Sequence, residues 1–174
     1  MYYAAQDCRI FGIAGFQLKI MERTTTNTRL IHASPGLVYE AFTTPGALAE
    51  WLAPQGMTGK VHDFDLYVGG GYKMSLFYTG KEYSDAGKSN NNEDRFTARF
   101  IELSPNSKIV QAINFDTDIP EYAGEMIMDV TLAREGDNTN VTIVFKKIPT
   151  GVALEDNEAG TDMSLEKLAK YVEQ

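Results

Sequence analysis

The stretch "HASPGLVYEAFTTPGALAEWL", from His32 to Leu52, decides the fold because it encodes two very short helices in succession. Ser34 and Thr44 each precede a Pro-Gly pair. A hydroxyl residue before proline is a typical helix start, since the hydroxyl can accept a free N–H group of the first turn and proline needs no donor there. The second start ends the first helix, and both segments carry apolar residues at helical spacing, including Trp51, the only tryptophan. Two short amphipathic helices that cover another part of the chain are therefore expected.

Strands are expected on both sides of these helices, because apolar and polar residues alternate there with a period of two. A threonine-rich strand is expected over residues 24–32. The glycine triplet at 69–71 lies between two later runs and is interpreted as a bulge or tight bend. The runs after the helices predict six consecutive antiparallel strands, over residues 58–68, 72–78, 95–103, 108–115, 125–133 and 140–145.

One amphipathic helix is expected at the C-terminus. Thr161 or Asp162 is the expected N-cap, and the acidic residues before it would form a solvated segment, since negative charge is favourable near a helix N-terminus. Leu165 and Leu168 then share an apolar face. The order of elements predicts an α+β fold in which a curved antiparallel sheet of six or seven strands wraps around this helix.

The composition is typical of one globular domain, expected over residues 24–174 after an N-terminal extension over residues 1–23. The 174 residues are 43% hydrophobic and 23% charged. The net charge of -8 repels phosphates, so neither nucleic acid nor a membrane is an expected partner. Cys8 has no second cysteine to pair with, no apolar run approaches the roughly 20 residues that span a bilayer, and the N-terminus lacks a secretory pattern. A cytoplasmic location is expected.

A set of motif residues accompanies this order of elements: Arg29, Ala33, Pro35, Val38, the run Ala41-Phe42-Thr43 with Pro45, Trp51 with Pro54, Gly69-Gly70, Glu102 with Pro105, and the closing "NEAGTDMSLEKLAKYVE". In this combination, from about residue 24 to the end, the chain resembles the SRPBCC superfamily of START-like, birch-pollen-allergen-like helix-grip proteins. More narrowly, it resembles the branch of homologues of the activator of heat-shock-protein-90 ATPase.

The resemblance implies a helix-grip fold with a cavity between the sheet and the C-terminal helix. Many members carry a tryptophan after the glycine that precedes the last helix, whereas Thr161 follows Gly160 here, so the role of that aromatic cannot be transferred. The superfamily includes binders, carriers and cyclases. Membership alone therefore does not define a function.

The expected strand phases turn several large apolar side chains toward the C-terminal helix. Two interpretations are open: a filled core, or a flexible apolar pocket in which thioethers and aromatic rings contact a ligand. Trp51 is more typical of a core residue, although in a helix-grip fold its ring could also contact a ligand. The candidate cavity residues are Phe42, Trp51, Tyr72, Met74, Phe96, Phe100, Gln111, Asn114, Met126, Met128, Leu165 and Leu168.

Polar residues inside such a pocket would be informative, because an unpaired buried polar group costs about 1–3 kcal/mol. In the strand over residues 108–115, one phase turns Gln111 inward and the other turns Asn114 inward, and either could bond to a bound molecule or to water. His32 and His62 have no further ligand at metal spacing, and no serine or cysteine nucleophile motif occurs. No metal, cofactor or catalytic residue is expected.

The leading functional hypothesis is therefore non-covalent binding of a small, largely apolar molecule in the cavity. The alternatives are a cyclase- or hydratase-like reaction in the same cavity, which a buried acid or histidine would favour, and chaperone-linked protein binding. The sequence also leaves a homodimer open.

Overall fold

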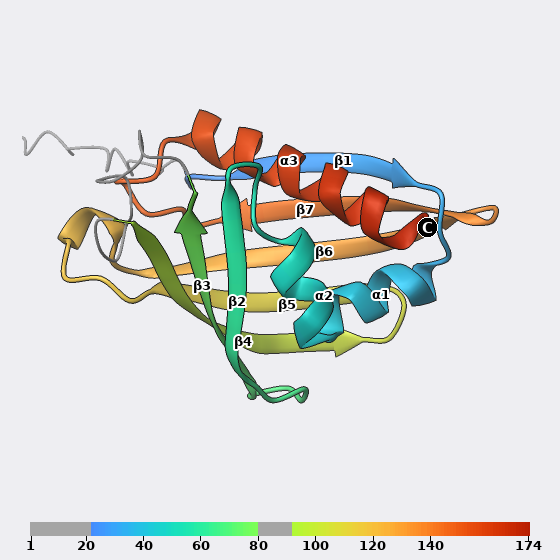
Figure 1. Ribbon diagram of the computed structural model, residues 1–174, viewed down its shortest axis with the longest axis horizontal. Helices are drawn as coiled ribbons and strands as arrows, with labels where there is room; N and C mark the ends of the chain where they lie inside the picture. The colour runs from blue at the N-terminus through green and yellow to red at the C-terminus, as the bar shows by residue number, and fades with distance from the viewer. Residues whose placement is uncertain (1–21, 80–91) are drawn as a thin grey trace, which may run out of the picture.

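The computed structural model describes residues 22–79 and 92–174 (Figure 1). Most of the expected N-terminal extension, with Cys8, lies outside the described residues. The elements run in the order β1 (Thr25–Ile31), α1 (Pro35–Thr43), α2 (Pro45–Trp51), β2 (Met57–Phe64), β3 (Gly71–Tyr78), β4 (Glu93–Ser104), β5 (Lys108–Phe115), the 3₁₀ turn η2 (Pro120–Tyr122), β6 (Glu125–Glu135), β7 (Asn138–Lys146) and α3 (Leu154–Val172).

The strands among the described residues form one antiparallel sheet of seven, in the order β1-β7-β6-β5-β4-β3-β2. Strands β2 to β7 are a meander, whereas β1 pairs with β7 at the opposite edge from β2. The connection from β1 to β2 must therefore cross the width of the sheet, and α1 and α2 make this crossing. Helix α3 runs along the same face beside β1 (Figure 1). The expected α+β architecture, a curved sheet around a C-terminal helix, is confirmed.

The two short helices begin at the expected prolines. The Ser34 hydroxyl accepts a hydrogen bond from the Leu37 N–H at 3.4 Å, as an N-cap does, whereas Thr44 makes no such side-chain bond. Trp51, on the last turn of α2, packs its ring edge-on to Phe42 with the centroids 4.6 Å apart. The buried faces of α1 and α2 thus meet each other over the sheet.

The expected start of the last helix at Thr161 or Asp162 was wrong, because α3 begins seven residues before Thr161, at Leu154. The Thr161 hydroxyl donates to the Asn157 carbonyl at 2.7 Å, within the helix, so this side chain is not a cap. The acidic residues expected in a preceding segment occupy the first turns of α3 instead. Gly160 is consequently inside the helix. None of the helices among the described residues has the length and apolar character to cross a membrane.

The strand expected over residues 58–68 also ends earlier, at Phe64, and a turn over residues 65–70 leads into β3. Gly69 has φ +99, which side chains rarely adopt, and a Cβ at Gly71 would lie 2.0 Å from the Ala98 carbonyl oxygen. The triplet therefore allows a tight bend and a close approach of β3 to β4. Register shifts between Val61 and Asp63, and between Phe100 and Glu102, mark two further irregularities in the pairing.

Candidate functional site

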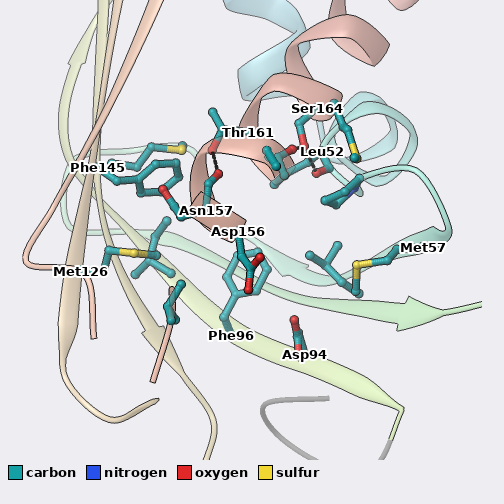
Figure 2. Close-up of a pocket in the computed structure, with 18 of the residues that line it drawn as sticks. Leu52, Met57, Asp94, Phe96, Met126, Phe145, Asp156, Asn157, Thr161 and Ser164 are labelled. Carbon is teal, nitrogen blue, oxygen red and sulfur yellow. Dashed lines mark hydrogen bonds between the residues drawn. The ribbon is translucent and has the colours of Figure 1, made fainter. Parts of the chain in front are cut away.

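A cavity of about 620 Å³ lies between the concave face of the sheet and the first half of α3 (Figure 2). Figure 2 shows Phe96, Met126 and Phe145 on the sheet side and Asn157, Thr161 and Ser164 on the helix side. The strands contribute Tyr72, Leu76, Tyr78, Asp94, Phe96, Ile113, Phe115, Met126, Met128, Ile143 and Phe145. Met57 is the first residue of β2. The helices and loops contribute Trp51, Leu52, Pro54, Gln55, Gly56, Tyr122, Gly151, Val152, Ala153, Asp156, Asn157, Ala159, Gly160, Thr161, Met163 and Ser164.

The structure brings five of the candidate residues together on this wall. They are Trp51, Tyr72, Phe96, Met126 and Met128. Another six are buried in the core without lining the cavity, namely Phe42, Met74, Phe100, Gln111, Leu165 and Leu168. Asn114 is exposed, so its place as a cavity candidate was wrong.

The interior is filled beside the second half of α3 and open beside its first half. Leu165 and Leu168, in the second half, are fully buried and fill the space above the sheet. In the first half, the small residues Ala159, Gly160 and Thr161 line the cavity. The volume is left open because α3 begins early and its first turns carry small and polar residues.

Trp51 belongs to the core and to the cavity wall at once. It is 1% exposed, and its indole N–H donates to the Ala41 carbonyl at 2.9 Å. That bond supplies the partner that a buried indole needs and fixes the ring between α1 and the cavity. Two side chains of α3 secure the end of α2 from the other side, since Ser164 donates to the Leu52 carbonyl at 2.8 Å and Lys167 to the Ala53 carbonyl at 2.7 Å.

The phase of β5 turns Gln111 inward, between Phe100 of β4 and Met128 of β6 in the register. The Tyr72 hydroxyl donates to Gln111 Oε1 at 2.9 Å. Burial raises the pKa of the Tyr72 phenol well above its ordinary value of 10.0, and the bond to Gln111 offsets this only in part. A neutral hydrogen-bonded pair therefore lies beside the apolar wall.

The sequence alone did not predict that the polar side chains of Asp94, Asp156 and Asn157 line the cavity. Asp94, 3% exposed, accepts a hydrogen bond from the Tyr78 hydroxyl at 3.2 Å. Asp156 and Asn157 come from the first turn of α3, and Asn157 Oδ1 accepts from the Thr25 hydroxyl at 2.5 Å. No signal placed Asp156 and Asn157 there, because the helix was expected to start after them. Asp94 precedes the expected start of its strand.

A second polar cluster lies on the opposite face of the sheet. His62 Nε2 is 2.8 Å from the Ser75 hydroxyl, which donates to Glu93 Oε1 at 2.5 Å, and Arg95 binds both oxygens of Glu93 at 3.1 Å. Ser75 is fully buried, and the carboxylate contacts the serine rather than the histidine. This arrangement differs from a nucleophile triad, in which the base binds the serine and the acid orients the base. We interpret it as a hydrogen-bond network that stabilises the packing of β2, β3 and β4 side by side.

The charged side chains on the described part of the cavity wall are all acidic. The described part of the wall includes two carboxylates and no lysine, arginine or histidine. Within the same described ranges, no three His, Cys, Asp or Glu side chains lie close enough together to hold a metal ion. The arrangement can therefore enclose an apolar molecule and offer it neutral hydrogen-bond partners, with negative charge on the wall.

The buried phenol of Tyr72 predicts a loss of stability at alkaline pH. Its pKa is raised in the folded state, so the stabilisation is complete below the unfolded value near 10.0 and is lost as the pH rises toward the folded value. In that window the free energy of unfolding should fall by up to about 1.4 kcal/mol per pH unit through this one group. Urea unfolding across this range should show a shallower decline for Tyr72→Phe than for the wild type. Equal slopes would contradict the assignment.

Comparison with known proteins agrees with this architecture. A protein of Chromobacterium violaceum is 34% identical over 87% of this chain and 98% of its own, with a TM-score of 0.78. The Mll3558 protein of Rhizobium loti is 27% identical over 87% of this chain and 97% of its own, with a TM-score of 0.65. The AHSA1-like protein of Aeromonas hydrophila, 20% identical over 86% and 92% of the two chains, has the same fold with a TM-score of 0.62.

No curated protein matches the chain. The family described as "Activator of Hsp90 ATPase homolog 1-like protein" matches residues 32–173, which is most of the chain and includes α1, α2, the meander and all of α3. The resemblance seen in the motif residues and the observed helix-grip architecture point to the same family. The chain therefore belongs to the activator of Hsp90 ATPase homolog 1-like family, within the SRPBCC superfamily.

Proposed function

We propose that the protein binds a small, largely apolar molecule non-covalently in the cavity below the first half of α3. The observation that carries this proposal is the cavity itself, whose volume of about 620 Å³ lies within the range of ligand pockets. Its wall combines aromatic rings with the thioethers of Met57, Met126, Met128 and Met163, which adapt to irregular apolar shapes.

Gly160 gives a steric test of this proposal. It lies on the wall, inside α3, and a Cβ added there would meet only Pro54 Cγ at 3.8 Å. Gly160→Phe should therefore place its ring in the cavity without disturbing the helix. With the neutral fluorescent probe 6-propionyl-2-dimethylaminonaphthalene, titrated by fluorescence, we expect this variant to bind at least about tenfold more weakly than the wild type, which corresponds to about 1.4 kcal/mol.

Gly160→Ala is the matched control. It should keep the probe affinity within a few fold and raise the free energy of unfolding by about 0.5–1 kcal/mol, because alanine costs less conformational entropy than glycine within a helix. Circular dichroism should show that the wild type, Gly160→Ala and Gly160→Phe are all folded. If Gly160→Phe then binds the probe as tightly as the other two proteins, the probe does not occupy this cavity.

A cyclase- or hydratase-like reaction is the second candidate function, and Asp94 favours it. This carboxylate is buried, lies on the cavity wall and is hydrogen-bonded to Tyr78, so it is in place to exchange a proton with a bound molecule. Native mass spectrometry of the protein purified from its own host would distinguish the two. A co-purifying molecule released unchanged supports binding, whereas a molecule converted by the wild type and left intact by Asp94→Asn supports catalysis.

A further inference from the structure

The amide of Gln111 carries an unpaired donor in the core, next to a residue of the cavity wall. Gln111 is fully buried, and its Nε2 has no hydrogen-bond partner among the described residues. Its Oε1 is already occupied by the Tyr72 hydroxyl. A buried donor without a partner costs about 1–3 kcal/mol, so a native structure normally supplies one, from the protein, from water or from a ligand.

The position of this amide relates it to the cavity. Tyr72, its hydrogen-bond partner, lies on the cavity wall, and so does Met128, its neighbour in the register with β6. Gln111 itself is not on the wall, and these two residues link it to the wall. Met128 is unbranched and flexible, so a small displacement of its thioether can open the donor to a molecule in the cavity.

The chemistry of the pair defines the group that fits it. Nε2 requires an acceptor, and the Tyr72 oxygen, whose proton is donated to Gln111, can accept one further hydrogen bond. A carbonyl oxygen satisfies the first position, and a hydroxyl group can satisfy both. An ionised carboxylate is a poor fit, because the described part of the wall offers Asp94 and Asp156 but no cationic side chain, and a buried charge without a counter-charge is costly.

We propose that the apolar ligand carries a neutral oxygen acceptor, a hydroxyl or a ketone, which the Tyr72–Gln111 pair receives at the inner side of the cavity. This inference rests on the proposed binding function and specifies the ligand class. Gln111 then acts in recognition rather than only in the core, and its substitution changes which molecules bind, beyond any change in stability.

The test uses naphthalenes that share one skeleton. These are 2-acetonaphthone, 1-(2-naphthyl)ethanol, 2-isopropylnaphthalene and 2-naphthoate, each titrated by displacement of the propionyl probe from the wild type and from Gln111→Met, which keeps the length of the side chain without its amide. The quantity compared is the ratio of the hydrocarbon Kd to the ketone Kd. We expect this ratio to be about five- to tenfold lower in Gln111→Met, which is the loss of one buried hydrogen bond. We expect 2-naphthoate to bind most weakly.

One further measurement keeps the test decisive if Gln111→Met does not fold. In the wild type, the ketone should shift the nuclear magnetic resonance signal of the Gln111 side-chain amide, and the hydrocarbon should not. An unchanged Kd ratio, with hydrocarbon binding intact, would overturn the inference and leave the proposed function standing. Failure of every probe to bind the wild type would overturn both.

Discussion

Trp51→Ala is expected to lower the free energy of unfolding by about 3–5 kcal/mol, the usual range for truncating a large buried aromatic residue. The ring is 1% exposed, packs against Phe42 and joins α1 to the cavity wall. Truncation removes these contacts beside an existing cavity, so the surrounding side chains cannot close the space. Urea unfolding followed by far-UV circular dichroism measures the effect, since the variant has no tryptophan left for fluorescence.

Trp51→Phe is the matched control for the indole N–H. It keeps an aromatic ring but leaves the Ala41 carbonyl without its 2.9 Å donor, and a loss of about 1–3 kcal/mol is expected. A change below about 1 kcal/mol for Trp51→Ala would mean that the ring contributes little to the packing of α1 and α2, because surface substitutions have effects of that size.

Gly71→Ala is expected to destabilise the protein by about 3 kcal/mol or more, at the upper end of the range for overpacking. The added Cβ would lie 2.0 Å from the Ala98 carbonyl oxygen, and the Ala98 carbonyl carbon and the Arg99 Cα would be 2.9 Å away. Because these atoms are backbone, no side-chain rotation can relieve the clash. The start of β3 must therefore move away from β4, beside Tyr72 on the cavity wall.

Gly46→Ala provides the comparison. Gly46 lies in α2 with no atom within 4 Å of an added Cβ, and alanine there should stabilise the helix by up to about 1 kcal/mol. Thermal unfolding of the two variants should therefore move in opposite directions from the wild type. A Gly71→Ala protein as stable as the wild type would contradict the close approach of β3 and β4.

The elements with strong local signals could be predicted from the sequence. A Pro-Gly pair that follows a hydroxyl residue predicted the start of α1 and again the start of α2. The regular alternation of apolar and polar residues predicted most of the strands. The start of α3 could not be predicted, because the Thr161 hydroxyl that bonds to the preceding turn of the helix has the same sequence signature as a cap. Because of that error, Asp156 and Asn157 were not among the candidate residues, although they lie on the cavity wall.

The phase of β5 could not be predicted for a different reason. Val110 and Ala112 are buried as well as Ile109, Gln111 and Ile113, so the strand lacks the alternation that reveals which side faces inward. The sequence also could not predict which part of the interior is filled and which part is an open cavity. It depends on how side-chain volume changes along α3 relative to the sheet, which is a property of the assembled fold.

The irregular pairing of β2 has a consequence for self-association. This strand forms one edge of the sheet, and an edge strand can template pairing with a second chain and lead to aggregation. Here the register shift between Val61 and Asp63 interrupts the row of backbone groups, and Lys60 and Asp63 place charges along it. Natural edge strands are protected in the same way. The free edge of β2 is therefore a poor template for pairing with a second copy of this chain.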